Sequence, residues 1–539
     1  MKRVFIFLSI AWMALLSLTA QGESNRYRVW LADKNESSYS TSRPEEFMSP
    51  AAIERRERQG IAFDTYDLPV NKHYLDEITK AGGEVIVTSR WMNTAVVACN
   101  DSATLRHISE LPFVSRIEWV WSTPQAGVSP KSRMKTLPDE DDRNINNTTP
   151  PSAHEQLYGL SWTQVSMLNL DSLHRAGYSG EGMTIAVVDA GFTGIDNIAA
   201  IDKSHIIGRY DLLKGDFETT GNDHGTSALS CMAAYDPFTY IGTAPKADYI
   251  LIITEDVTAE HAFEEDMWVR GVELADSLGA QIISSSLCYT EFDEPWMSYT
   301  TDNLDGHTAF STRGANIAAQ KGILVVTAAG NEYLTSWGML GFPSDAEQVM
   351  TVGGVDATKQ HSRFSSKGYV NERDVKPNIV AMATATQCYR QTGDIAALNG
   401  TSFSTPLITG AMACLWQALP QLSVGELIEL VEKSASQYHS PDSLLGHGVP
   451  DFYAAYNYLS GTTATQLQRD IYITHRTLHL PATAAGSVVT LYNIGGNKVW
   501  QATPLQGTTS LELEAVERGL YLVTVTTPTE HRTLKIFVH

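Results

Sequence analysis

The sequence has few cysteines, a shortage of positive charge and no long apolar run after its N-terminus. Its 539 residues include five cysteines, and no two of them have the spacing of metal ligands. With 39 Lys and Arg against 61 Asp and Glu, the formal net charge of −22 argues against nucleic acid as a partner. These absences leave a globular protein with 43% hydrophobic residues, long enough for about three or four domains.

The first residues have the pattern of a secretory signal peptide. A basic segment at 1–3 precedes an apolar run at 4–18, and the small residues that follow predict cleavage near Ala20. A membrane anchor is the alternative, but the run is short for a bilayer and no stop-transfer pattern follows it. We therefore expect residues 1–20 to be removed, with no transmembrane segment left afterwards, and the protein to be secreted or held at the cell surface.

Residues 21–122 are predicted to form a small α+β domain. The order β-α-β-β-α-β predicts a ferredoxin-like fold, to which the segment 49–60 adds a further helix. The pattern alone leaves an unrelated binding module as an alternative. Residues 123–156 are rich in Ser, Pro, Asp, Asn and charged residues, which predicts a linker.

Residues 157–461 alternate buried strands with helices. Four continuous apolar runs, at 183–188, 249–253, 281–284 and 322–326, are typical of strands in a parallel sheet. A helix is predicted at 163–176, before the first of these strands. The helical stretches between the strands predict a doubly wound α/β sheet with its ligand crevice at the carboxyl ends of the strands. Residues 462–539 contain short strands separated by turns, which predicts a small β-sandwich.

The segment Asn399–Pro406 carries the first catalytic candidate. Ser402 follows Gly400 and precedes an apolar run that predicts a buried helix ending before Pro420, with Pro406 in its first turn. A serine at a helix N-terminus is placed where it could attack a carbonyl and where free N–H groups would stabilise the resulting oxyanion. A lone Gly-Thr-Ser, however, is more often an ordinary helix cap.

Two further candidates lie upstream of Ser402. Asp189 ends the run 183–188 and precedes a small residue and Gly191, and His224 stands just before a helical run. Taken singly, Asp189 is more often a turn former and His224 a structural histidine. Together the three residues give the chain order Asp, His, Ser, which is one of the known orders of a serine-nucleophile triad.

Motifs in a fixed order resemble the subtilisin-like serine peptidases of family S8, over roughly residues 158–460. They are 185–191, 224–226, 242–247, 327–331, 364–368, 376–381, 399–406 and 446–451. The resemblance implies that Ser402 attacks to form an acyl-enzyme, that His224 is base and then acid, and that Asp189 orients His224. It makes Asn331 the oxyanion donor.

The substrate-binding segments are assigned by the same resemblance. An extended peptide is expected beside Ser284, Ser286, Leu287, Ala329 and Gly330. Three positions depart from the family pattern: Ala190 replaces Thr or Ser, Ser227 replaces a second histidine, and Cys288 replaces a glycine. The segment 291–306 is expected to be an added surface loop, with pocket shaping as the alternative.

The resemblance also indicates partners. The N-terminal domain has the place of an inhibitory propeptide, and no cofactor is required. Structural calcium is common in the family, but no spaced ligand loop is found, so no metal ligand is assigned. The C-terminal domain, through Gly519-Leu520-Tyr521 and a last strand with Lys535, resembles sorting domains of the type IX secretion route of Bacteroidetes. A sandwich that binds substrate or cell wall is the alternative.

The leading hypothesis is a secreted serine endopeptidase acting on protein or peptide substrates. An inactive subtilisin fold that serves as a surface binding protein is a second hypothesis, and an acyl transferase or peptide cyclase with the same triad is a third. All four catalytic positions are filled, which argues against the second.

Overall fold

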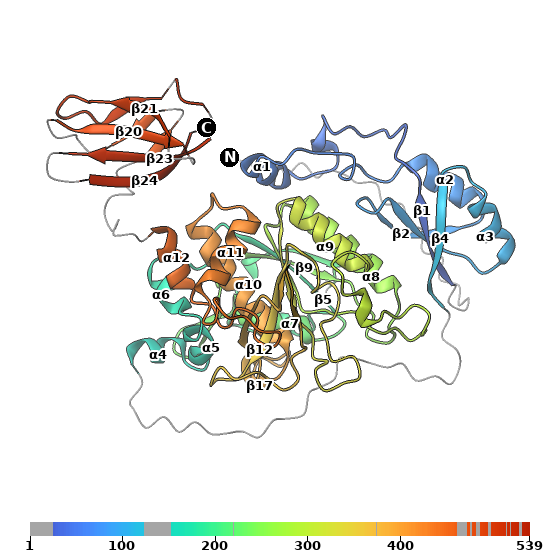
Figure 1. Ribbon diagram of the computed structural model, residues 1–539. Coiled ribbons are helices and arrows are strands. Elements are labelled where there is room, and N and C mark those ends of the chain that lie inside the picture. The colour runs from blue at the N-terminus through green and yellow to red at the C-terminus, as the bar shows by residue number, and fades with distance from the viewer. Residues whose placement is uncertain are drawn as a thin grey trace, which may run out of the picture. The chain divides into compact units, whose positions relative to one another are not determined.

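The computed structural model describes residues 25–122 and 152–460, apart from positions 219 and 373, and most of 472–538 (Figure 1). The predicted signal peptide and nearly all of the predicted linker lie outside the described residues. The chain forms two units, one up to Phe452 and one from Tyr453 onward. None of the described helices has the length and apolar character that a membrane span requires.

The N-terminal domain is a four-stranded antiparallel sheet covered by helices, as the sequence predicted. The strands lie in the order β2 (Glu84–Ser89), β3 (Thr94–Ala98), β1 (Arg26–Leu31) and β4 (Val114–Trp121), with helices α2 (Lys72–Lys80) and α3 (Ser102–Ser109). This strand order is that of a ferredoxin-like fold. Its core is apolar, and Val29, Ile78 and Ile108 are fully buried in it.

Helix α1 (Pro50–Gln59) is the additional helix of this domain. Ser49 caps it by accepting the N–H of Ala52, and Gly60 ends it in the left-handed region with a φ of 69°. The helix rests on the end of α8 (Phe263–Leu278), since a Cβ atom at Gly279 would lie 2.7 Å from the Cβ of Ala51. Gly279 therefore allows a close approach that a larger residue would block.

A buried charge cluster joins the N-terminal domain to α8. Asp276, with no exposed surface, forms ion pairs with Arg55 and Arg56 of α1 and with Arg90, which follows β2. Burial alone would raise the pKa of Asp276, but the charges of the three guanidinium groups lower it to about 2. The two domains are thus held together by a carboxylate that stays ionised well below neutral pH.

The peptidase domain is built on seven parallel strands. Their order is β15 (Ile379–Met382), β12 (Met350–Val355), β11 (Leu324–Ala328), β10 (Ile282–Ser285), β5 (Thr184–Asp189), β9 (Asp248–Ile253) and β6 (Ile206–Asp211). The chain begins the sheet with β5 and adds β6 and β9 on one side of it. It then adds β10, β11, β12 and β15 in turn on the other side. Strand β5 is therefore the point where the winding direction changes, which is where ligands bind in such sheets.

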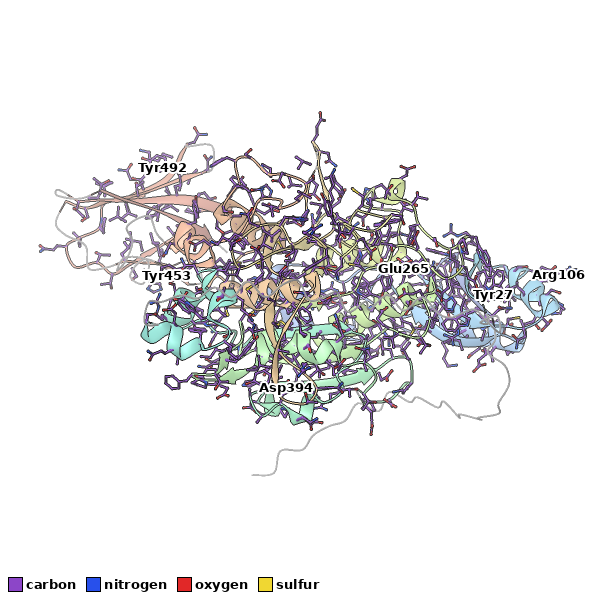
Figure 2. The ribbon with its side chains drawn as sticks, turned by 90° about the horizontal axis from the view of Figure 1, so that it is seen from below. Tyr27, Arg106, Glu265, Asp394, Tyr453 and Tyr492 are labelled. Atoms are coloured by element: carbon purple, nitrogen blue, oxygen red, sulfur yellow. The ribbon has the colours of Figure 1, made fainter. Side chains whose placement is uncertain are left out.

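Two helix layers cover this sheet (Figure 1). Helix α8 packs beside α9 (Phe310–Gln320), and α7 (His224–Ala233) packs beside α10 (Thr401–Ala418). Figure 2 labels Glu265 on α8, a buried carboxyl that accepts hydrogen bonds from Tyr299 and Ser311. The predicted helix at 163–176 is two helices, α5 (Trp162–Ser166) and α6 (Leu170–Arg175), because Asn169 takes a φ of 52° between them.

The remaining elements of this unit are short. They are α4 (Ala153–Tyr158), α11 (Val424–Ser434), β7 (Tyr235–Asp236), β8 (Tyr240–Ile241), β13 (Tyr369–Val370), β14 (Val375–Lys376), β16 (Thr386–Tyr389), β17 (Ile395–Leu398) and the 3-10 turns at 44–46, 195–197, 203–205 and 301–303. Helix α12 (Phe452–Ser460) starts at the boundary between the two units.

The second unit has two small antiparallel sheets, as predicted for a β-sandwich. One is β18 (Tyr472–Thr474), β19 (Thr477–His479) and β22 (Ser510–Glu512), and the other is β21 (Lys498–Ala502), β20 (Val488–Asn493), β23 (Gly519–Thr526) and β24 (His531–Val538). Buried side chains from both sheets, among them Leu478, Leu491 and Val523, share one core. Such a shared core is how two sheets form one sandwich.

Candidate active site

Asp189 and His224 lie against each other at the carboxyl edge of the sheet. Asp189 is the last residue of β5, and its Oδ1 accepts a hydrogen bond from His224 Nδ1 at 2.7 Å and one from the N–H of Ala190 at 2.8 Å. A bond at Nδ1 places the proton of a neutral imidazole on that nitrogen and leaves Nε2 as an acceptor. His224 is therefore in the tautomer that a general base needs.

The second carboxylate oxygen of Asp189 lacks a hydrogen-bond partner among the described residues. Asp189 is fully buried, and its Oδ2 is one of the few buried polar atoms with this property. Ala190 supplies no hydroxyl group where the family pattern has Thr or Ser. Without that hydroxyl the carboxylate has one local donor fewer, and the bond from His224 to Oδ1 does not depend on it.

The environment of His224 raises its pKa above 6.5. Burial is the largest effect and lowers the pKa, but the charge of Asp189, its hydrogen bond and the charge of Asp223 together outweigh burial. Because Asp189 favours the protonated ring of His224, it also stabilises the imidazolium that forms when His224 accepts a proton.

Ser402 lies in the first turn of α10. Gly400 precedes the helix with a φ of 146°, and Ser402 is nearly buried, with 9% of its surface exposed. The first N–H groups of a helix have no partner inside it, so the backbone N–H of Ser402 is available to an incoming oxyanion. The ring of the next residue, Phe403, lies 6.1 Å from that of His224.

Pro406 has a structural role that the sequence did not predict. It lies inside α10, after the first turn, where its missing N–H removes a bond to the carbonyl oxygen of Ser402. Ser286 replaces that bond, since its Oγ donates to the carbonyl of Ser402 at 2.9 Å. The expectation that Pro406 sits in the first turn is wrong, and its ring instead makes the nucleophile's carbonyl depend on Ser286.

Asn331 lies beside the same helix end. Its Oδ1 accepts hydrogen bonds from the N–H of Thr401 at 3.0 Å and from Thr401 Oγ1 at 3.1 Å. Because these bonds hold the oxygen of the amide, its Nδ2 group remains as a donor on the other side. The structure therefore brings Asp189, His224, Ser402 and Asn331 together at one edge of the sheet.

The predicted substrate-binding residues fall into two groups. Ser286, Leu287, Ala329 and Gly330 follow β10 and β11, at the edge where the four residues above meet. Ser284 is different, because its buried Oγ accepts a hydrogen bond from Thr409 of α10. Its side chain contributes to the packing between α10 and the sheet.

Cys288 fills space that a glycine would leave open. Its Sγ donates to the carbonyl oxygen of Ala328 at 3.1 Å. A Cβ atom at Gly341 would lie 2.7 Å from the Cβ of Cys288, and one at Gly330 would lie 3.7 Å from its Sγ. The Cys288 side chain thus occupies space beside Gly330 and Gly341 that a glycine at 288 would leave open.

The loop 291–306 contacts the N-terminal domain. The ring of Trp296 lies 5.6 Å from that of Trp119, and Glu294 accepts a hydrogen bond from Ser122 at the end of β4. The loop still lies on the surface, where Trp296 is 62% exposed, and part of it packs against the N-terminal domain. The paired aromatic residues at 119 and 296 were the available signal, but a sequence does not show which aromatic residues meet.

Among the described residues, no group of three or more His, Cys, Asp or Glu side chains is arranged to hold a metal ion. No calcium ligands are therefore assigned. Serine-nucleophile chemistry draws its base and oxyanion donors from the protein itself.

Comparison with known proteins gives the class of this fold and site. Residues 180–448 match the model of the subtilase family, and residues 26–136 match the peptidase S8 propeptide domain of Bacteroidota. Subtilisin E of Bacillus subtilis is 28% identical over 312 residues, which cover 56% of this chain and 73% of that protein. Subtilisin DY of Bacillus licheniformis is 26% identical over 275 residues, covering 50% and 90%.

A solved structure has the same fold. It is that of fervidolysin from Fervidobacterium pennivorans, a keratinolytic enzyme related to subtilisin. The superposition covers 97% of this chain and 77% of fervidolysin, with a TM-score of 0.56 and 16% sequence identity. The fold and the family matches agree, so the chain is a serine peptidase of the S8 subtilase family with a propeptide domain before it.

The pKa of His224 sets the first prediction. A histidine base works only when neutral, so kcat/KM should rise with pH through an apparent pKa above 6.5, because Asp189 raises the pKa of the ring. The profile is measured with a peptide that has no titrating group in this range. A profile without an acidic limb between pH 5 and 9 would show that another group is the base.

Proposed function

We propose that the chain is a secreted serine endopeptidase whose triad is Asp189, His224 and Ser402. In this proposal His224 takes the proton of Ser402 as the hydroxyl attacks a peptide carbonyl, and later gives it to the leaving amine. Asn331 Nδ2 and the N–H of Ser402 stabilise the oxyanion. The observation that carries the proposal is the 2.7 Å contact between Asp189 and His224 at the sheet edge where Ser402 begins α10.

Two other functions use the same fold. An inactive binding protein would not need all four catalytic positions, and here all four are filled and meet at one edge. An acyl transferase would use the same acyl-enzyme but pass the acyl group to an amine. Masses of products formed with and without an added amine nucleophile separate transfer from hydrolysis.

The N-terminal domain is proposed to inhibit the peptidase until it is removed. Its last strand ends with Trp121 at 4.0 Å from the ring of His261, and Ser122 then donates to Glu294. His261 lies in the loop that follows β9, and Glu294 lies in the loop that follows β10. The chain therefore leaves the domain beside the edge where the triad residues meet, which favours a cut in the segment that follows.

The C-terminal unit is proposed to direct secretion through the type IX route. The support is the resemblance of 519–521 and the last strand to sorting domains of Bacteroidetes, together with the Bacteroidota propeptide match. A separate core allows this unit to act independently of the peptidase domain.

Replacement of Asn331 tests the oxyanion site. Asn331→Ala should lower kcat by about 10²–10³ with little change in KM, because the donor acts mainly in the transition state. Steady-state kinetics on a chromogenic peptide measure both constants, with Asn497→Ala in the second unit as a matched control. A change confined to KM would assign Asn331 to substrate binding.

Replacement of Ser402 tests self-processing. Ser402→Ala should accumulate as a folded precursor, while the unmodified chain and a Ser440→Ala control release a fragment cut between about residues 122 and 155. Mass spectrometry locates the cut, and the separated fragment should inhibit the mature enzyme. Cutting of purified Ser402→Ala chain with no other protease present would refute self-processing.

Truncation tests the role of the tail. Removal of residues after about 461 should leave peptidase activity intact and change where the protein is found, as measured by cell fractionation of the native host. Loss of folding or activity with unchanged location would contradict the sorting role.

A further inference from the structure

Acidic side chains gather beside the triad, between the end of β9 and the start of α8. Glu264 accepts hydrogen bonds from the N–H groups of Asp256 and His261, and Asp293 accepts one from the N–H of Glu260. With Glu255 these residues form what we call the acidic cluster: Glu255, Asp256, Glu260, Glu264 and Asp293. It lies on the β9 side of β5, opposite Asn331, which follows β11.

Glu255 is the member nearest the triad. It follows β9 by two residues, and Ile253 at the end of β9 is in register with Asp189 at the end of β5. Its Oε1 accepts hydrogen bonds from Tyr289 at 2.6 Å and from Thr254 at 2.8 Å, and the residue is partly exposed. No ion pair reaches Glu255 or Glu264 from the described residues.

Burial raises the pKa of Glu255 to about 8, with the charges of Glu260 and Asp189 acting in the same direction and its hydrogen bonds acting against them. The raised pKa indicates that no cation lies close to the Glu255 carboxyl group, because a nearby cation would favour its ionised form. The same holds for Glu264, whose pKa is also raised, first by burial and then by the charge of Glu255.

His261 is a second, independent sign of an absent partner. It is 3% exposed, and neither ring nitrogen has a hydrogen-bond partner in the described part of the chain. The charges of Asp293 and Asp256 act on it, which places it beside the acidic cluster, while burial lowers its pKa and keeps it neutral. Trp121 covers this ring at 4.0 Å while the N-terminal domain is in place, so removal of that domain would leave both nitrogens open to a new partner.

The N-terminal domain supplies a cation close to this place. The guanidinium group of Arg26 lies 4.3 Å from the ring centroid of Trp121 and 4.5 Å from that of Phe263, two residues beyond His261. Arg26 is also near enough to His261 to act on its charge. When the N-terminal domain leaves, this positive charge leaves with it.

A substrate strand would present alternate side chains to the two sides of the crevice. The peptide pairs with the segment at Ser286, which lies between the end of β11 with Asn331 and the ends of β5 and β9. Successive side chains of an extended peptide point to opposite faces. If the residue before the scissile bond faces Ala329 and Gly330, the preceding residue faces His224 and Glu255.

We infer that the peptidase selects a lysine or arginine at the second residue before the scissile bond, with Glu255 as its principal counter-charge and the rest of the acidic cluster around it. This inference rests on the proposed peptidase function and names the class of substrate. The printed hydrogen bonds of Glu255 are made by Oε1, which leaves Oε2 as the oxygen to pair with the cation.

The chain's own processing segment has the matching pattern. Lys131, Arg133 and Lys135 occupy every second position, the period of an extended strand, and the propeptide match ends at residue 136. The bonds after Met134 and Thr136 then have Arg133 and Lys135 in the second position. The first cut is therefore expected after residue 132, 134 or 136.

Peptide kinetics test the inference. Two peptides of the sequence at 130–138 are compared, one natural and one with Lys131, Arg133 and Lys135 replaced by Gln. Mature enzyme should prefer the natural peptide, and Glu255→Gln should lower the ratio of the two kcat/KM values by at least about tenfold, because the charged pair is lost. Gln keeps an oxygen for Tyr289 and Thr254. The exposed Glu429→Gln change should leave the ratio unaltered.

The outcomes separate this inference from the peptidase assignment. Equal cleavage of both peptides, or a ratio unchanged in Glu255→Gln, overturns the specificity while the enzyme remains a peptidase. Cleavage of neither peptide, nor of a denatured protein mixture, overturns the peptidase proposal itself. Mapping of the cut in the natural peptide gives a direct check, since a bond without Lys or Arg in the second position contradicts the inference.

Discussion

The site depends on one constraint, which is that all seven strands of the central sheet run in the same direction. Their carboxyl ends meet at one edge, and neighbouring ends lie one strand spacing apart. Asp189 ends β5, Ser286 follows β10, Asn331 follows β11 and Glu255 follows β9. Residues from distant parts of the chain therefore need only short loops to reach the same crevice.

The attachment of the N-terminal domain follows a different principle. Asp276 and three guanidinium groups are buried together, and withdrawing one partner would leave an uncompensated charge in a water-poor place. A buried ion-pair cluster of this kind contributes little net stability. It does, however, select the one surface that supplies the matching charges. It also lies on α8, away from the triad, so cutting the connecting segment leaves it intact.

Most of the fold and the catalytic candidates could be predicted from the sequence. Continuous apolar runs gave the strands, and Ser49 and Gly60 marked the bounds of α1, because these signals are local. Contacts between distant segments could not be predicted. The burial of Ser284 against Thr409, the bond from Ser286 to Ser402 and the meeting of Trp119 with Trp296 depend on tertiary placement, and Asn169 broke a helix that its neighbours favoured.

The proline in α10 links two positions that are far apart in the chain. Since Pro406 has no N–H to offer the carbonyl of Ser402, the hydroxyl of Ser286 becomes the donor on which that carbonyl relies. Loss of the Ser286 hydroxyl would leave the carbonyl oxygen of Ser402 without this donor. A chain with a residue other than proline at 406 would tolerate that loss, because the N–H of residue 406 could donate to the same oxygen. We therefore expect the residue types at positions 286 and 406 to vary together among homologous sequences.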